Sequence, residues 1–285
     1  MISQIRVYHY PLSRSVRVLW VLNELWISQF EIKRIKLLLG EGYSEEFLKL
    51  NPNHSVPVIQ LSYNGKEYVF FESTALVRLL AGEFRNHLLI NLKPKPDLIP
   101  SLKNGASLIE IGEFEQWYAF AGITLDMCLW SIRVIFDFRK KDQEKDLLET
   151  YVNKWNTELL PQIIQRFEDG RYFVLKDFGF SIVDIILGHV LSWARKYPFL
   201  NEFSPNLHKY FRGLRSRQAY KVSTEDAHLF EKDARLWSKL VFKISAFLQL
   251  MWIFKHTKCP LIRELVCSSK LNPYNRLWGC HIVII

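Results

Sequence analysis

Two patterns of apolar and polar residues divide the chain, one with a period of two and one with helical spacing. Alternation with a period of two predicts strands in four runs, at residues 5–9, 30–35, 58–63 and 66–71. Apolar residues at helical spacing predict a helix over residues 15–26 and another from residue 72. Residues 1–82 therefore read as a β-α-β unit followed by a β-β-α unit. From about residue 104 the pattern is helical throughout.

The stretch from residue 51 to 78 carries the most specific local signals. Asn64-Gly65 separates the last two alternating runs, which is the strongest short-range hairpin signal. Pro57 stands inside an apolar run, so we expect a special backbone there, and a cis peptide bond would supply one. Glu72-Ser73 opens a helix whose free amides can hold a carboxylate. Together with an exposed backbone at Val56, this suits a short acidic peptide such as glutathione.

These motifs carry a family resemblance. Asn-Pro-x-His-Ser-Val-Pro-Val at 51–58, followed by Glu-Ser-x-Ala at 72–75, resembles the thioredoxin-like domain of glutathione transferases. The resemblance spans about residues 4–222 and implies an α/β thioredoxin-like domain followed by an all-α helical-bundle domain. The implied divisions are a glutathione-binding domain at residues 1–82, a proline-containing linker at 83–103, a helical domain at 104–224 and an unmatched extension at 225–285. Without a ligand, the same motifs would be a bulged edge strand and an ordinary helix cap.

The resemblance also implies where the thiol of glutathione would lie. The Pro-x-Ser turn ending at Ser13, with Arg17 four residues later, matches the serine-type transferases, most closely a bacterial enzyme of the delta or theta kind. A hydroxyl and a helix N-terminus would lower the pKa of a thiol from roughly 8.5. Ser13 could instead serve only as a helix cap. Other hydroxyls near the turn are alternative candidates, in the order Ser15, Tyr8 and Tyr10.

Further roles follow from the same resemblance. The implied glutathione-binding residues are His54, Val56, Pro57, Glu72 and Ser73. Glu72 would face the γ-glutamyl ammonium group, and Ser73 with its amide would hold the γ-glutamyl carboxylate. His54 would lie near the glycine carboxylate, or be a solvated turn residue. Ser55 stands where many bacterial relatives have lysine.

The second substrate should lie between the domains, against the first helix of the helical domain. The candidates are Glu113, Trp117, Tyr118 and Phe120, although aromatic residues at helical spacing are also typical of a core. Later in the chain, Ser181 and Asp184 form a Ser-x-x-Asp box before an apolar run. This box predicts a helix cap with a structural role.

Composition narrows the function classes. The 285 residues are 49% hydrophobic and 24% charged, as in ordinary globular proteins. The net charge of +9 permits anionic ligands, nucleic acid or membrane surfaces, but no dense basic stripe favours nucleic acid. Four cysteines without a Cys-x-x-Cys motif, and an N-terminus unlike a signal peptide, predict a reducing cytoplasm. No cysteine precedes Cys128, which argues against mixed-disulfide chemistry.

The extension holds an apolar run, residues 244–254, that is too short to span a bilayer. We predict that it packs on the helical domain, with a membrane-surface helix as the alternative. The His and Cys residues after it have irregular spacing, so no metal is predicted.

The sequence thus predicts a homodimeric detoxifying glutathione transferase that conjugates the thiolate to an electrophilic apolar small molecule. The rival hypothesis is a non-catalytic transferase-like module for protein–protein interaction, as in some translation and stress factors.

Overall fold

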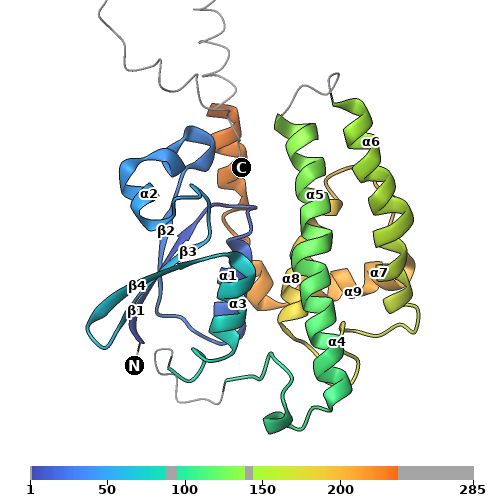
Figure 1. Ribbon diagram of the computed structural model, residues 1–285, viewed down its shortest axis with the longest axis horizontal. Helices are drawn as coiled ribbons and strands as arrows, with labels where there is room; N and C mark the ends of the chain where they lie inside the picture. Colours follow the sequence, from blue (N-terminus) through green and yellow to red (C-terminus); the bar gives the residue numbers. More distant parts are fainter. Residues whose placement is uncertain (1, 88–94, 139–143, 237–285) are drawn as a thin grey trace, which may run out of the picture.

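The computed structural model describes residues 2–87, 95–138 and 144–236. Its first domain is a four-stranded sheet in the order β2-β1-β3-β4 with helices on both faces (Figure 1). β1 and β2 are parallel, and β1–β3 and β3–β4 are antiparallel. The elements are β1 Ile2–His9, α1 Val16–Glu24, β2 Glu31–Arg34, η1 Leu37–Leu39, η2 Glu41–Tyr43, α2 Glu45–Leu50, β3 Val58–Tyr63, β4 Lys66–Phe71 and α3 Ser73–Ala81.

Strand alternation assigns the two faces of the sheet. Val7 and Ile59 belong to the large core that also contains residues of α1 and α3. Their neighbours Tyr8 and Val58 belong to a smaller core with Phe47 of α2. Successive side chains of a strand point to opposite faces, so a single run of residues serves both cores. The α/β thioredoxin-like architecture predicted from the sequence is confirmed.

The hairpin and the special backbone at Pro57 are also confirmed. Asn64 and Gly65 both have positive φ, 50° and 75°, as a two-residue hairpin turn requires. β3 and β4 pair from Val58–Phe71 to Tyr63–Lys66 without a break. The Val56–Pro57 peptide bond is cis.

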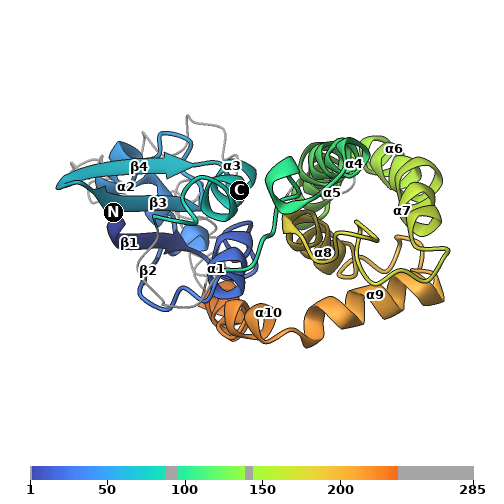
Figure 2. The same cartoon turned by 90° about the horizontal axis from the view of Figure 1, so that it is seen from below.

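The second domain consists of helices packed around α8, whose side chains are almost all buried (Figure 2). Its elements are η3 Leu102–Asn104, α4 Leu108–Ala119, η4 Phe120–Leu125, α5 Asp126–Arg133, η5 Val134–Phe138, α6 Lys145–Lys154, η6 Trp155–Leu159, α7 Leu160–Arg166, α8 Ile182–Ala194, α9 Pro205–Ser216 and α10 Gln218–Ser223. The elements η4, η5 and η6 are π-helical turns. The predicted Ser181–Asp184 capping box starts α8.

The two domains meet closely along α8. A Cβ atom on Gly188 would lie 2.8 Å from Leu214 of α9 and 3.0 Å from Trp20 of α1. Such distances are shorter than real Cβ contacts, so this position requires glycine for α1, α8 and α9 to approach. α10 then packs beside α1, and the chain returns to the first domain (Figure 2).

The first part of the extension lies within the described residues. Residues 227–236 are helical and lie beside the first domain (Figure 1). Asp233 pairs with Arg34 of β2, and the ring of Phe230 lies 5.9 Å from that of Tyr10, centroid to centroid. Lys196 of the helical domain also approaches Phe230. This segment therefore contacts both domains, and the predicted packing of the extension on the helical domain rested on its apolar run, which lies outside the described residues.

Two further predictions concern the apolar run of the extension and a metal site. The apolar run at 244–254 and the cysteines after it lie outside the described residues. One described stretch, Leu108–Asp137, is long and apolar enough to cross a membrane by length and composition, and 44% of its most apolar window is buried against the protein. The described part of the chain contains no group of three or more His, Cys, Asp or Glu side chains that could hold a metal ion.

Candidate functional site

The pairing of the strands places three segments of the predicted site at one edge of the sheet. Tyr8 of β1 pairs with Val58 of β3, and Val58 pairs with Phe71 of β4. The chain after β1, before β3 and after β4 therefore leaves the sheet at the same edge. These three exits lead to the Ser13 turn, the Val56–Pro57 bond and the Glu72–Ser73 start of α3.

The Ser13 turn is closed by hydroxyl groups. The Oγ atom of Ser13 lies 2.7 Å from the carbonyl oxygen of Tyr10 and 2.7 Å from the Oγ atom of Ser15. Ser13 is partly buried, whereas Ser15 is fully buried. Leu12, just before Ser13, has a φ of 58°, which a non-glycine residue adopts rarely. Ser15 occupies the cap position of α1, but its side chain makes no cap hydrogen bond.

The Ser15 hydroxyl also contacts a histidine, which in turn contacts a carboxylate. Ser15 Oγ lies 2.7 Å from Nδ1 of His9, a fully buried residue at the end of β1. His9 Nε2 lies 3.0 Å from Oδ2 of Asp226, just after α10. A carboxylate only accepts hydrogen bonds at neutral pH, so His9 Nε2 carries a proton and donates to Asp226. We call these four residues, Ser13, Ser15, His9 and Asp226, the turn cluster.

Helix α8 holds the turn from the other domain. Trp193 Nε1 donates to the carbonyl oxygen of Leu12 at 3.0 Å. His189 Nε2 lies 3.0 Å from the carbonyl oxygen of Ser13, and its Nδ1 accepts from Arg17 Nε at 3.2 Å. Burial and the charge of Arg17 hold the pKa of His189 well below its usual value. Neutral His189 therefore donates to Ser13, and the turn is fixed by two hydrogen bonds to its backbone.

A buried guanidinium group connects the turn to α3. Arg17 is fully buried, pairs with Asp126 of α5 and donates to the Ser73 hydroxyl at 3.1 Å. Arg14 Nε also donates to Asp126, at 2.7 Å. Burial lowers the pKa of Arg17, and Asp126 opposes this effect. Two guanidinium groups against one carboxylate leave an excess positive charge beside the start of α3.

The start of α3 is open to an anion. Glu72 is exposed, has a φ of 73° and makes no side-chain cap hydrogen bond. The first amides of a helix have no carbonyl partner within it, so they can bind a carboxylate. The Ser73 hydroxyl accepts from Arg17, and the Ser73 backbone amide belongs to the open first turn. An unusual backbone conformation of a non-glycine residue is a common feature of binding sites.

The other predicted binding residues lie in the turn before β3. The ring of His54 stacks on Tyr43 at 4.4 Å, centroid to centroid. Its Nδ1 atom is buried and has no hydrogen-bond partner within the described residues. The Tyr8 hydroxyl instead donates to Gln60 at 2.9 Å, on the side of the sheet that packs on α2. Tyr8 is thus a packed strand aromatic, while His54 offers a ring nitrogen.

Three of the four predicted second-substrate residues, Glu113, Trp117 and Tyr118, lie on two faces of α4, and the fourth, Phe120, begins η4. Glu113 pairs with Arg166 of α7 at 2.6 Å, and the Arg166 guanidinium lies over the ring of Trp117. Residues four apart share a helix face, so both belong to the face toward α7. The adjacent Tyr118 donates to the carbonyl oxygen of Thr74 in α3. Of the three, Tyr118 is the one that bonds to the first domain.

Sequence reasoning missed several neighbours of the Ser13 turn. Arg14 lies over the rings of Trp130 and Trp193, at 4.6 and 5.1 Å from their centroids. Trp130 is partly exposed on α5, next to Asp126. The position of Arg14 directly after Ser13 was a usable signal. Nothing local marks Asp126 or Trp130 as site residues, because their place depends on how α5 approaches α1.

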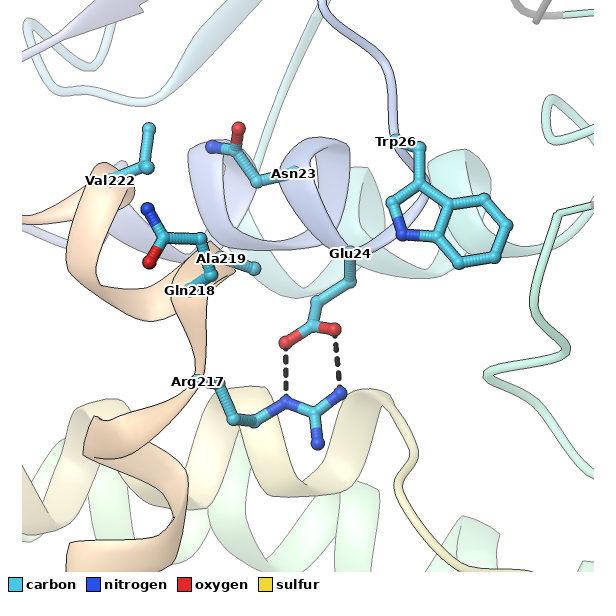
Figure 3. A pocket seen from close by; sticks show the side chains of 7 residues that line it. All are labelled: Asn23, Glu24, Trp26, Arg217, Gln218, Ala219 and Val222. Carbon is cyan, nitrogen blue, oxygen red and sulfur yellow. Dashed lines mark hydrogen bonds and ion pairs between the residues drawn. The ribbon is translucent and has the colours of Figure 1, made fainter. Parts of the chain in front are cut away.

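A pocket of about 410 Å³ lies elsewhere, at the far end of α1 (Figure 3). Its lining residues are Asn23, Glu24, Trp26, Arg217, Gln218, Ala219 and Val222. Two bonds of 2.6 and 2.7 Å join the Arg217 guanidinium to the Glu24 carboxylate within it (Figure 3). The first turn of α1 leads to Ser13, so this pocket is separate from the candidate site.

Comparison with known proteins agrees with this geometry. Residues 3–82 match the family model "Glutathione S-transferase, N-terminal domain". A glutathione S-transferase domain-containing protein of Dictyostelium discoideum is 28% identical over 198 residues, which cover 67% of this chain and 68% of that protein. A probable elongation factor 1-gamma of Arabidopsis thaliana is 27% identical over 65% of this chain and 40% of its own length.

Solved structures show the same fold. Glutathione transferase URE2P8 of Phanerochaete chrysosporium, solved with oxidized glutathione, superposes with a TM-score of 0.63 at 18% identity, over 80% of this chain and 97% of that one. Glutathione transferase F7 of Populus trichocarpa superposes with a TM-score of 0.62 at 22% identity, over 78% of this chain and 99% of that one.

Proposed function

We propose that this chain, a member of the glutathione S-transferase family by its N-terminal domain, binds glutathione and activates its thiol at Ser13. The observation that carries the proposal is the shared sheet edge, where the Ser13 turn, the Val56–Pro57 backbone and the open start of α3 converge. The structural neighbour solved with oxidized glutathione supports the choice of ligand. A cytoplasmic location and a role in detoxification remain parts of this proposal.

In this proposal each part of glutathione meets a complementary group. The γ-glutamyl carboxylate binds the first amides of α3, and its ammonium group faces the exposed Glu72 carboxylate. The peptide backbone pairs with Val56 beside Pro57, and the glycine carboxylate lies near His54, in the turn before β3. The thiol then reaches the Ser13 hydroxyl at the start of α1. The nearby guanidinium groups and the helix N-terminus favour the thiolate over the thiol.

The electrophile would approach from the helical domain. Trp130 presents a partly exposed ring beside Arg14, the residue that follows Ser13. An apolar electrophile stacked on Trp130 would lie next to the thiolate, and positioning would supply much of the rate. Tyr118 lies nearer α3 and is largely buried, so it forms the wall between the domains. No feature selects one electrophile.

We also propose that two copies associate through the outer face of α4 and its continuation. Leu108 and Ile109 are 73% and 75% exposed, and Ile123 and Met127 are 64% and 54% exposed. Apolar side chains this exposed along one helical stretch are typical of an interface. Ultracentrifugation should find a dimer, and Ile123→Glu should yield monomer that still binds glutathione if the site is complete in one copy.

Calorimetry with the full chain and reduced glutathione tests the proposed function. We expect binding that weakens in Glu72→Ala and stays unchanged in Glu83→Ala, an exposed carboxylate near the other end of α3. A conjugation assay with an electrophilic chloronitrobenzene then tests catalysis. Absence of glutathione binding in the wild-type protein would refute the proposal.

A second candidate function is a non-catalytic module for protein assembly. The similarity to the elongation factor 1-gamma of Arabidopsis thaliana favours it, since that alignment spans most of this chain but less than half of that protein. Calorimetry and the conjugation assay separate the two functions. Binding without turnover, or no binding with a stable fold, would favour the module.

A further inference from the structure

The turn cluster connects the partly exposed Ser13 hydroxyl to a carboxylate near the surface through an unbroken series of short contacts. The steps are 2.7 Å from Ser13 Oγ to Ser15 Oγ, 2.7 Å from Ser15 Oγ to His9 Nδ1, and 3.0 Å from His9 Nε2 to Asp226 Oδ2. Ser15 and His9 are fully buried, and the Asp226 side chain is 27% exposed. Buried polar groups are costly unless all are paired, so such a series restricts where each proton can lie.

The proton positions follow from the chemistry of each group. With Nε2 donating to Asp226, neutral His9 has Nδ1 free to accept, and the Ser15 hydroxyl donates to it. Ser15 Oγ then accepts from the Ser13 hydroxyl and from the Tyr10 amide, 3.1 Å away. In this state the Ser13 proton points inward, to Ser15 or to the Tyr10 carbonyl oxygen. Neutral His9 therefore leaves Ser13 Oγ as an acceptor toward the thiol.

Protonated His9 reverses the series. Its Nδ1 then donates to Ser15, Ser15 donates to Ser13, and the Ser13 proton points outward. In this state the imidazolium of His9 and the carboxylate of Asp226 form a charge-assisted hydrogen bond. The two states thus differ in whether the outermost hydroxyl accepts a proton or donates one.

We propose that the turn cluster is a proton relay that takes the thiol proton of glutathione to His9, with Asp226 stabilising the resulting imidazolium. The thiol gives its proton to Ser13 Oγ, Ser13 gives its own to Ser15, and Ser15 gives its own to His9 Nδ1. One proton leaves sulfur, one arrives on His9, and the thiolate is left facing the Ser13 O–H as a donor. The relay rests on the proposed function, since it needs glutathione at Ser13.

The relay also gives a role to the start of the extension. Asp226 reaches His9 because residues 224–236 are held on the first domain by other contacts, the Arg34–Asp233 ion pair and the packing of Phe230 on Tyr10. These contacts do not involve Asp226, so Asp226→Asn should leave the segment in place. After the product leaves, the proton on His9 Nδ1 returns to Ser15, Ser15 returns one to Ser13, and Ser13 releases one to solvent, which restores neutral His9 with Nε2 donating to Asp226.

The test uses the full chain, reduced glutathione and the ultraviolet absorbance of the bound thiolate at neutral pH. In Asp226→Asn we expect a thiolate fraction and a kcat about tenfold lower, because the imidazolium formed on His9 would lose its charge-assisted hydrogen bond to a carboxylate. The KM for glutathione should change by less than about threefold, since no binding contact is lost. The matched control is Glu225→Gln, which removes the adjacent exposed carboxylate and should match the wild type.

The outcomes separate the relay from the function it serves. If the wild-type protein forms the thiolate and Asp226→Asn has the same thiolate fraction and kcat, the relay would be overturned and the transferase proposal would stand. Equal losses in Asp226→Asn and Glu225→Gln would assign the effect to surface charge and also overturn it. No bound glutathione in the wild-type protein would refute both proposals. His9→Asn, checked for folding by circular dichroism, should reproduce the thiolate loss of Asp226→Asn.

Discussion

Among the described residues, the turn cluster can be compared with a second cluster of serine and carboxylate groups, and the two differ in how far they are buried. The turn cluster ends at the partly exposed Ser13 hydroxyl and at the partly exposed Asp226. The second, which we call the cap cluster, consists of Ser181, Asp184 and Tyr210 and is buried completely. In the cap cluster, Asp184 accepts from the Val174 amide, the Ser181 amide and the Tyr210 hydroxyl at 2.9, 2.9 and 3.0 Å.

The difference indicates how similar groups take different roles. Every acceptor site of Asp184 is used by a group that the fold itself supplies, so the cap cluster can only hold the start of α8 in place. The turn cluster has a hydroxyl at the surface whose proton can point either way. In the proposed relay, the exposure of one end, rather than the residue types, separates the turn cluster from the structural cap cluster.

The largest expected effect is on the stability of the cap cluster. Asp184→Ala removes a helix cap and leaves the Val174 amide and the Tyr210 hydroxyl buried without their acceptor. We expect a loss of about 2–4 kcal/mol in the free energy of unfolding, measured with urea. Asp177→Ala, an exposed carboxylate before the same helix, is the control and should lose less than about 0.5 kcal/mol. Folded Asp184→Ala protein should still bind glutathione, and a stable but inactive variant would contradict the structural role.

The same carboxylate predicts a pH dependence. Burial raises the pKa of Asp184 to about 6 in the folded protein, from its ordinary value of 3.8. A raised pKa in the folded state means that its stabilising contribution is complete below about pH 4 and is lost as the pH rises through about 6. The stability difference between wild type and Asp184→Ala should therefore shrink by roughly 1–3 kcal/mol from pH 4 to pH 7. Urea unfolding of both proteins across this range would show it, and a difference that grows with pH would refute the sign.

The next effect is catalytic and belongs to the turn cluster. Ser13→Ala removes the hydroxyl that faces the thiolate, and a hydrogen bond to a charged group is worth ~1.5–3 kcal/mol. We expect kcat for conjugation at neutral pH to fall roughly ten- to a hundredfold, with a smaller change in glutathione affinity. Unchanged turnover in Ser13→Ala would exclude Ser13 as the thiol-activating group, and a loss in Ser15→Ala alone would transfer the role to Ser15. Tyr8→Phe should leave kcat unchanged, because the Tyr8 hydroxyl bonds to Gln60.

The sequence predicted the parts of this comparison that depend on neighbouring residues. The hairpin at Asn64-Gly65, the cap box at Ser181 and the special backbone at Pro57 follow from local chemistry, and each is found in the structure. The order of strands and helices followed from periodicity for the same reason. The assignment of Ser13 as catalytic followed from a family motif and remains a proposal.

Contacts between distant segments could not be predicted in this way. His9 and Asp226 lie 217 positions apart, and nothing near Asp226 indicates that its segment returns to the first domain. The faces of α4 were also unpredictable, since Glu113 and Trp117 pair with Arg166 of α7 while the adjacent Tyr118 reaches α3. Such placements depend on how helices pack, which one periodic pattern does not determine.

Binding should be affected less than catalysis at the start of α3. Glu72→Ala removes one exposed carboxylate opposite the proposed ammonium group. A partly solvated ion pair contributes ~0.2–1 kcal/mol or slightly more, so glutathione affinity should fall about three- to tenfold. Stability should change little, since Glu72 makes no cap hydrogen bond. Calorimetry measures the affinity, and equal affinities for Glu72→Ala, Glu83→Ala and wild type would place the ammonium group elsewhere.

The smallest expected effect is the stability change in Ser13→Ala, which can be compared directly with that in Ser181→Ala. Ser181→Ala removes the cap of a buried helix, in which Ser181 Oγ accepts from the Val183 amide, and should cost about 0.5–2 kcal/mol of unfolding free energy. Ser13→Ala removes a hydroxyl at the edge of its cluster, and Ser15 keeps its bonds to His9 and to the Tyr10 amide. Because Ser13 is only partly buried, we expect Ser13→Ala to cost less unfolding free energy than Ser181→Ala, even though the Ser15 amide loses its 3.2 Å bond to Ser13 Oγ. Urea unfolding of the two variants under one set of conditions measures both values. If Ser13→Ala cost as much stability as Ser181→Ala, the turn hydroxyl would be a structural group, and its loss of activity could no longer be assigned to the thiolate.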